Sequence, residues 1–304
     1  MRVGISLSSS YRVEDPREGA RWMVERAAAS RDAGLDSLFV GDHHVTGPGT
    51  YYQNVAILGR LLAEWGDGPA GCLFLLPLWH PVLLAEQVAT LASVHSGRFI
   101  MQCAVGPADV QFSGMGVDPR FRPSRFEECL DAVRRLWAGE SVSGARRYDF
   151  TDARIAPLPP EEIEVWIGGE AEAAIERAAR LGDGWLAAPG LTPEQAAAQG
   201  AQYRATREAM GEPPRAVAIR RDVFVAATDE EAEAIAGPIV DRGYRGFDPS
   251  AVVYGSPETV AAKFREYAAT GYTDVIVRNL VPHQRHAIEC IGRLAEVRER
   301  VADA

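Results

Sequence analysis

Residues 72–94 read CLFLLPLWHPVLLAEQVATLASV, an apolar run of strand length followed directly by a helix-forming stretch. The run Cys72–Leu76 is short and wholly apolar, as expected of a strand that is buried on both faces. Pro81 suits the first position of a helix, where its missing amide removes no hydrogen bond. The residues after it repeat at the helical period and share one face: Leu84, Val88, Leu91 and Ala92. This stretch predicts a strand and a crossover helix of a parallel sheet.

The same alternation recurs along the whole chain. Eight strand-like runs are separated by amphipathic stretches: Val3–Leu7, Ser37–Val40, Cys72–Leu76, Phe99–Val105, Val165–Gly168, Gly184–Leu186, Asp222–Ala226 and Asp274–Val277. Eight strands joined by helices predict an α/β protein with the (β/α)8 or TIM-barrel fold. Since such barrels use about 250 residues or more as one unit, we expect residues 1–304 to form a single domain.

Two stretches between the fourth and fifth predicted strands break this regular pattern. They are residues 106–123 and residues 140–160, and the second contains the run Pro157-Leu158-Pro159-Pro160. Catalytic sites of β/α barrels are built in the strand-to-helix loops, so we expect both insertions to form substrate walls or a lid. Three glycines are expected to end helices before the next strand: Gly34, Gly182 and Gly271.

Composition narrows the possible partners and chemistry. The net charge is -10 and the pI is near 5.2, which opposes binding to nucleic acid. We find no signal peptide after Met1 and no apolar run of membrane-spanning length, so we expect a cytoplasmic protein that does not enter membranes. The cysteines have no metal-binding or disulfide-framework spacing and are expected to be buried thiols: Cys72, Cys103, Cys129 and Cys290.

Lys263 is the single lysine of the chain. It lies among charged neighbours on a predicted helix whose apolar stripe contains Val260, Phe264 and Tyr267, so it is expected at the surface. Schiff-base aldolases, pyridoxal enzymes and P-loop proteins all need a lysine in the site. These classes are therefore excluded.

The second predicted strand ends in Phe39-Val40-Gly41-Asp42-His43-His44. In a barrel, the carboxyl end of a strand delivers polar side chains to the active-site rim. A histidine beside a carboxylate can accept or donate a proton near neutral pH, so His43 is the first candidate catalytic residue. A histidine that caps backbone groups at the strand end is the alternative.

Several further segments, in order along the chain, carry a resemblance to a known family. They are Cys72–Pro81 with Ala85–Leu91, His95-Ser96-Gly97-Arg98-Phe99, Arg125-Phe126-Glu127-Glu128 through Trp137, Ile167-Gly168-Gly169, Ala178–Trp185, and Gly255-Ser256-Pro257-Glu258. Each is weak alone. Together they resemble the bacterial-luciferase-like superfamily of flavin monooxygenases and deazaflavin-dependent oxidoreductases.

The resemblance implies roles for individual residues. His43 matches the family's active-site histidine, and Asp109 resembles the position of a general acid, with a solvated loop aspartate as the alternative reading. The bond between Cys72 and Leu73 matches the place of a non-prolyl cis peptide behind the cofactor ring. The other residues expected to contact the cofactor are Asp42, Gly106, Gly168 and Gly169, and those expected to line the substrate pocket are His44, Tyr51 and Trp79.

Glycines Gly168 and Gly169 lie where a strand passes into a helix, so free amides there are expected to hold the cofactor's phosphate. Many relatives have a small hydroxyl residue or a glycine next. This chain has Glu170 and Glu172 instead, and their carboxylates would repel a phosphate unless they turn to solvent.

The predicted function is a luciferase-like oxidoreductase that uses coenzyme F-420 or FMN on a small organic substrate. The Cys72-Leu73 pair and the arginine-rich, lysine-poor composition favour F-420 slightly. The resemblance also implies a homodimer and, with FMN, a separate flavin reductase. Two alternatives remain: a non-catalytic flavin-binding relative, and a metal-dependent barrel hydrolase built on Asp42, His43, His44 and His80.

Overall fold

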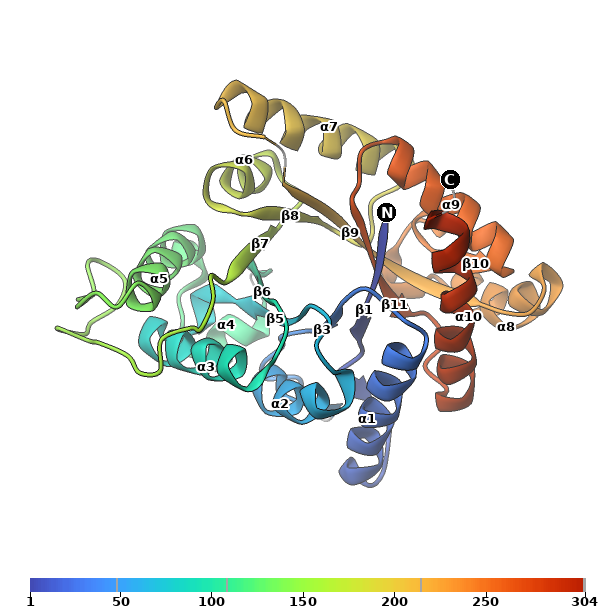
Figure 1. Cartoon of the computed structure of the whole chain (residues 1–304), viewed down its shortest axis with the longest axis horizontal. Coiled ribbons are helices and arrows are strands. Elements are labelled where there is room, and N and C mark those ends of the chain that lie inside the picture. Colours follow the sequence, from blue (N-terminus) through green and yellow to red (C-terminus); the bar gives the residue numbers. More distant parts are fainter. Residues whose placement is uncertain (48, 108, 214, 303–304) are drawn as a thin grey trace.

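The computed structural model describes residues 1–47, 49–107, 109–213 and 215–302. Strands alternate with helices along the chain (Figure 1). The strands are β1 (Arg2–Leu7), β2 (Ser10–Tyr11), β3 (Leu38–Val40), β4 (Thr50–Tyr51), β5 (Ala70–Leu75), β6 (Phe99–Ala104), β7 (Glu164–Gly168), β8 (Gly184–Ala187), β9 (Ala216–Val225), β10 (Val253–Gly255) and β11 (Asp274–Asn279). The α-helices are α1 (Pro16–Asp32), α2 (Asn54–Trp65), α3 (Pro81–Val94), α4 (Val110–Gly114), α5 (Arg122–Trp137), α6 (Glu172–Leu181), α7 (Pro193–Ala209), α8 (Asp229–Asp241), α9 (Pro257–Ala269) and α10 (Gln284–Ala302).

The strands close into a barrel. From β1 the parallel order runs through β3, β5, β6, β7, β8, β9 and β11, and β11 pairs again with β1. Within the described residues, each of the eight predicted runs overlaps one of these strands, so the prediction of a (β/α)8 barrel is confirmed. The short strand β10 extends β9 outside the barrel, and β2 and β4 form a small antiparallel pair.

The seventh strand begins earlier than the sequence predicts. The prediction starts at Asp222, whereas β9 starts at Ala216. The charged run Arg220-Arg221-Asp222 breaks the apolar pattern of this strand, and a charged run is read as a loop. In the structure, side chains alternate across the strand, so Arg220 and Asp222 share the inner face with Ala216 and Ala218.

The barrel interior is packed by side chains from five strands, one each from β3, β6, β7 and β11 and two from β9. These residues form a cluster of their own, separate from the core between barrel and helices: Phe39, Ile100, Trp166, Ala216, Ala218 and Ile276. The large rings need small residues opposite them. A Cβ at Gly71 would overlap the carbonyl oxygen of Ile100, and one at Gly4 would overlap Ser37 Oγ.

Helices form the outer layer (Figure 1), and several begin where the sequence supplies a cap. Asp15 caps α1, Thr192 and Gln195 form a capping box on α7, and Ser256 caps α9. Of the glycines expected after helices, Gly34 and Gly271 have positive φ angles of 67° and 89°. Gly182 also directly follows its helix, α6, but is extended, and a Cβ there would crowd the carbonyl oxygens of Ala178 and Gly184.

The cysteine and lysine predictions are confirmed. All four cysteines are buried free thiols, and Lys263 lies on the outer surface of α9, where it pairs with Glu266. Among the helices of the described residues, none combines the length and the apolar character needed to cross a bilayer.

Candidate functional site at the carboxyl end of the barrel

A cavity of about 640 Å³ lies at the carboxyl end of the barrel strands. Its wall includes the chain from Ser6 to Ser10 at and after the end of β1, the loop after β3 (Gly41–Thr46), the start of α4 (Asp109–Gln111), one residue each of β4 and β5, and arginines of β9 and β11. Pockets of about 300–1,000 Å³ are typical for small molecules and cofactors. This end is also where β/α barrels build their active sites.

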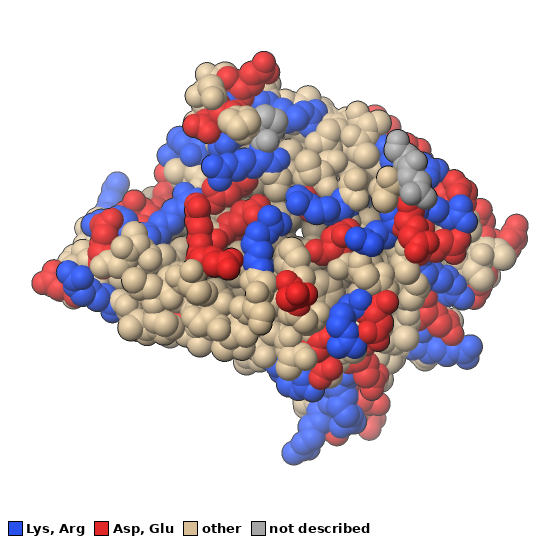
Figure 2. Space-filling model, viewed as in Figure 1, with Lys and Arg blue, Asp and Glu red and all other residues tan. Residues whose placement is uncertain are grey.

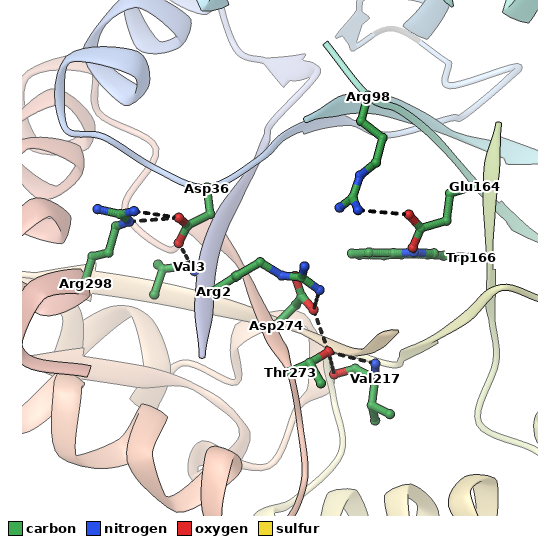
Figure 3. A network of polar contacts seen from close by, with 10 residues as sticks. All are labelled: Arg2, Val3, Asp36, Arg98, Glu164, Trp166, Val217, Thr273, Asp274 and Arg298. Carbon is green, nitrogen blue, oxygen red and sulfur yellow. Dashed lines mark hydrogen bonds and ion pairs between the residues drawn. The ribbon is translucent and has the colours of Figure 1, made fainter. Parts of the chain in front are cut away.

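A larger recess of about 870 Å³ lies at the opposite end, where Met1 and Ala302 approach each other. Both arginines that line it are paired: Arg2 with Asp274, and Arg298 with Asp36 (Figure 3). The remaining charged side chain of this lining is an exposed acid, Glu299, so the recess offers an anionic ligand few free groups. The cavity at the carboxyl end is therefore the better candidate site.

Asp42 is a buried carboxylate just beyond β3, and three groups converge on it. Its Oδ2 accepts hydrogen bonds from the Leu75 amide and from Trp79 Nε1, both at 2.8 Å. Its Oδ1 lies 3.2 Å from His44 Nε2, at ion-pair distance. The carboxylate is only 3% exposed, so it holds the loop and the His44 ring in place.

His43 lines the cavity and is exposed to it. Its Nδ1 lies 2.8 Å from the carbonyl oxygen of Asp42. Because a carbonyl oxygen only accepts hydrogen bonds, Nδ1 carries the proton and Nε2 keeps a lone pair in the neutral ring. The side chain is therefore prepared to act as a proton acceptor at Nε2. The loop is also held by Gln53, which donates to the His43 carbonyl.

Asp109 lines the same cavity but serves first as the cap of α4. Its Oδ1 accepts a 3.0 Å hydrogen bond from the Gln111 amide, and Oδ2 accepts one of 3.1 Å from Gln111 Nε2. Gln111 Oε1 accepts from the His44 amide at 2.8 Å. Gln111 thus ties the Asp109 loop to the His43–His44 loop, a role that the sequence pattern did not reveal.

The expected cis peptide between Cys72 and Leu73 is absent. In the described residues, the cis bond that occurs is Ala156–Pro157. The pairing of β5 with β6 runs without a break from Ala70 to Leu75, and successive side chains of a regular strand point to opposite faces. Leu73 therefore lines the cavity.

The same alternation turns Cys72 away from the cavity and into the core behind the strand. It is fully buried, and burial raises the pKa of the thiol well above its usual value. Cys72 is therefore no direct contact for a group in this cavity, which corrects the expectation that both residues of the pair would face the cofactor.

Gly168 and Gly169 lie at the carboxyl end of β7, on the same end of the barrel as the cavity, but they do not line it. Helix α6 begins three residues after Gly169, and its Ala171 cap position makes no side-chain hydrogen bond. The side chains of Glu170 and Glu172 are exposed. The Gly169 amide donates to the Leu186 carbonyl oxygen at 3.4 Å, so the amides that follow it at the start of α6 are the candidates to receive an anion, and both carboxylates face solvent.

Of the remaining predicted site residues, one lines the cavity and two do not. Tyr51 lines the cavity, and burial raises the pKa of its phenol to about 12, with Asp42 adding to the shift. Trp79 and Gly106 lie behind the wall: Trp79 binds Asp42, and Gly106 turns the chain after β6 with a φ of 78°.

One of the two insertions does not reach the cavity. Residues Asp109–Gln111 of the first insertion line it, whereas none of residues 140–160 does. The second insertion follows α5 and packs outside it: four of its amides, from Ala145 to Tyr148, donate to Glu128. Because this segment connects a helix to a strand, it does not belong to the strand-to-helix loops of the rim. The expectation that it forms a substrate wall is wrong.

The sequence analysis missed the arginines of the cavity. Arg220 of β9, Arg278 of β11, and Arg245 all line it. The available signal was a charged residue at an inward position near the end of an otherwise apolar strand. Arg245 and Val45 are also non-glycine residues with positive φ, 53° and 50°, and both border the cavity. Such backbone strain is often found at functional sites.

Histidines outside this cavity carry no comparable arrangement. His283 and His286 lie 5.3 Å apart at the surface of the start of α10, and His80 packs against Phe150. Within the part of the chain that the structure describes, no group of three metal-ligating side chains is found. The metal-dependent hydrolase therefore gains no support from the geometry.

Comparisons with known proteins agree with this geometry. A family model described as luciferase-like monooxygenase matches residues 1–252. An F420-dependent glucose-6-phosphate dehydrogenase from Microbacterium testaceum is 27% identical over 199 residues, which cover 62% of this chain and 59% of that protein. An FMNH(2)-dependent dimethylsulfone monooxygenase from Pseudomonas fluorescens is 29% identical over 236 residues, covering 74% of this chain and 62% of that protein.

These curated relatives are thus matched over about three fifths of their own length. Among solved structures, the monooxygenase RslO1 from Streptomyces bottropensis superposes with a TM-score of 0.85 at 21% identity. The match covers 97% of this chain and 98% of that one. It shows that the whole barrel, including the end that carries the cavity, follows a fold already seen in such proteins.

Proposed function

The chain belongs to the luciferase-like monooxygenase family, and we propose that it is an oxidoreductase that uses coenzyme F-420 or FMN on a small organic substrate. The observation that carries the proposal is His43, whose Nε2 keeps a free lone pair at a cavity of about 640 Å³. The relatives include proteins named for each cofactor, and a slight preference for F-420 follows from the sequence.

The residues present fit a planar cofactor with a phosphate-bearing tail. Leu73 offers an apolar surface to the cavity, and the open amides after Gly168 and Gly169 are suited to an anionic tail. Buried polar atoms without hydrogen-bond partners in the described structure belong to residues that line the cavity, among them Ser9 Oγ and Arg220 Nη2. Such atoms are expected where a ligand completes the site.

The bound cofactor would supply hydride transfer in the case of F-420, or oxygen chemistry in the case of FMN. The protein would supply a base and a fixed geometry. His43 would take a proton from the substrate at Nε2, with Nδ1 held by the Asp42 carbonyl. Asp42 would act as a positioning residue, since its carboxylate fixes the His44 ring and the loop.

A titration of the purified protein with each cofactor tests the first half of the proposal. Fluorescence quenching should saturate with one cofactor and not with the other. Oxygen uptake then separates the reactions, because monooxygenation consumes oxygen and hydride transfer does not. If neither cofactor saturates, the proposed function is wrong.

The role of His43 is tested with His43→Ala. If His43 is the general base, the rate of substrate turnover should fall at least ~100-fold, while the cofactor dissociation constant stays within about threefold. His283→Ala, at a surface histidine outside the cavity, is the matched control. Unchanged turnover of the His43 variant would contradict the proposal and favour a non-catalytic flavin-binding relative.

We further propose that the protein works in the cytoplasm as a homodimer and, if it uses FMN, with a separate flavin reductase. The family resemblance supports the dimer and the reductase, and the cytoplasmic location rests on the expectation from the sequence. Light scattering after size-exclusion chromatography tests the dimer, and a mass of one chain at micromolar concentration would contradict it. The flavin reductase is tested by measuring whether the rate of substrate turnover depends on an added reductase.

A further inference from the structure

The cavity has a cationic side that the proposed proton transfer does not use. It consists of Arg220, Arg245 and Arg278, which we call the arginine wall. Arg220 and Arg278 lie on the paired strands β9 and β11, where Arg220 is opposite Ile276 and Arg278 is opposite Asp222. Both arginines thus project into the barrel from neighbouring strands, and their positions are offset by two residues along the strand direction.

The wall holds more positive than negative charge. Asp222 is the acid that pairs with it in the described structure: its carboxylate lies 3.5 Å from Arg220 Nε and 3.5 Å from Arg245 Nη1. Tyr244 also donates to Asp222, at 2.9 Å. Arg278 donates to a neutral group, Ser8 Oγ, at 3.3 Å. The wall therefore has three guanidinium groups, of which two share one carboxylate and the third has no acidic partner within the described residues.

Arg220 has two donors that make no hydrogen bond within the described residues, Nη2 and an Nε that lies 3.5 Å from Asp222 Oδ1. Both nitrogens are buried. In Arg2, at the other end of the barrel, the same two nitrogens hold the two oxygens of Asp274 at 2.7 Å each. A planar guanidinium edge fits carboxylate, sulfonate and phosphate groups in this bidentate manner.

Electrostatics favours an incoming anion as well. The pKa of Arg220 is lowered to about 10, chiefly by burial and also by the charges of Arg278 and Arg245, against the opposing effect of Asp222. The two acids that line the cavity are engaged elsewhere: Asp42 binds Leu75 and Trp79, and Asp109 caps α4. An anion at the wall would relieve the repulsion among the arginines.

We propose that the arginine wall binds an oxyanion of the substrate, so that the substrate is a small organic molecule with a carboxylate, sulfonate or phosphate group. The reacting carbon would lie on the His43 side of the same cavity. The assignment to the substrate rests on the proposed function, whereas anion binding itself does not. The turn at Gly168 and Gly169, which does not line this cavity, remains for the cofactor tail.

Calorimetric titration of the cofactor-free protein with inorganic phosphate, sulfate and propionate at constant ionic strength tests the site. Wild type should bind at least one of them, and Arg220→Gln and Arg278→Gln should each weaken binding at least tenfold. Arg285→Gln, at an exposed arginine of α10, should bind as wild type does. Two separate variants keep the test valid if one of them misfolds, which circular dichroism reports.

A second titration separates the substrate from the cofactor tail. FMN is compared with riboflavin, and F-420 with its phosphate-free chromophore, on wild type and both arginine variants. The proposal expects equal cofactor affinities in all three proteins. If the variants weaken only the phosphate-bearing forms, the wall is a cofactor site and the proposal is overturned.

The proposal is also overturned if wild type and the arginine variants bind the three anions equally weakly. Since these titrations need neither turnover nor cofactor, a wild-type protein that binds an oxyanion but neither cofactor would overturn the proposed redox function and leave the anion site standing.

Discussion

Arginines occupy the inner face of the barrel at both ends, but their partners differ. At the amino end, Arg2 is bidentate to Asp274, and Arg98 lies 3.4 Å from Glu164, which also accepts from Trp166 Nε1 (Figure 3). At the carboxyl end, two arginines of the wall, Arg220 and Arg245, share Asp222, and the third, Arg278, donates to the neutral Ser8 hydroxyl. The same residue type thus closes one end and leaves unpaired charge at the other.

The surface of the amino end shows the same mixture of charges. Figure 2 views the molecule from this end, and basic and acidic side chains lie next to one another around the central hollow. Mixed charges of this kind leave little net field for a ligand. We infer that the paired charges at the amino end stabilise the barrel, whereas the unpaired charges at the carboxyl end serve function. Functional sites commonly lower the stability of a protein in this way.

The largest effect is expected between the two ends, where Gly71 lets β5 approach β6. Gly71→Ala would press a Cβ into the carbonyl oxygen of Ile100, and overpacking against backbone should lower the free energy of unfolding by about 3 kcal/mol or more. Urea unfolding followed by circular dichroism measures it.

Gly292→Ala is the matched control, since a Cβ there meets open space on α10. It should stabilise the protein by about 0.5–1 kcal/mol. If both variants changed the free energy of unfolding equally, the barrel interior at Gly71 would have space for an additional methyl group.

The next largest effect tests the amino end. Arg2→Met would leave the Asp274 carboxylate, whose side chain is 3% exposed, without its bidentate partner. Breaking a buried pair typically lowers stability by about 3–5 kcal/mol, and because Arg2 is itself half exposed we expect about 2 kcal/mol. The double variant Arg2→Met/Asp274→Leu should recover part of the loss, and no recovery would contradict the pairing argument.

The carboxyl end should respond with the opposite sign. Arg278→Met removes a guanidinium that faces Arg220 and donates to a neutral hydroxyl. Relief of repulsion should raise the free energy of unfolding by about 1 kcal/mol, measured by urea unfolding at low ionic strength. High salt should shrink the gain. A loss of stability comparable to that of Arg2→Met would erase the distinction between the two ends.

The barrel could be predicted from the sequence because its pattern is repetitive: an apolar strand-like run followed by an amphipathic helical stretch recurs eight times. The sequence also predicted that Asp42 and His43 lie at the carboxyl end of the barrel, because they directly follow a predicted parallel strand. It could not show that Cys72 faces away from the cavity, because the expectation of a cis bond overrode the simple alternation of side chains along β5.

The partners of the arginines were equally hidden from sequence reasoning. Arg2 and Asp274 are separated by 272 residues in the sequence. The sequence around Arg2 and Arg220 does not show which arginine has a bidentate acidic partner, and the closed barrel does. The same holds for Gln111, whose side chain joins two loops that are far apart in sequence.

The smallest expected effect concerns Tyr244, which donates to Asp222 beside the arginine wall. Since Arg220 and Arg245 remain near that carboxylate, Tyr244→Phe should lower the free energy of unfolding by only about 0.5 kcal/mol at pH 7. Burial, and then the charge of Asp222, raise the pKa of this phenol to about 12 from its ordinary value of 10.

A raised pKa in the folded protein means that the stability due to Tyr244 is fully present below pH 10 and is lost as the pH rises through about 12. The difference between wild type and Tyr244→Phe should therefore be constant from pH 7 to 9 and change above pH 10 in urea unfolding. Anion binding at neutral pH should also weaken in the variant, because Asp222, freed from the phenol, neutralises the arginines more completely. Stronger anion binding would instead show that Asp222 does not compete with the anion for these arginines.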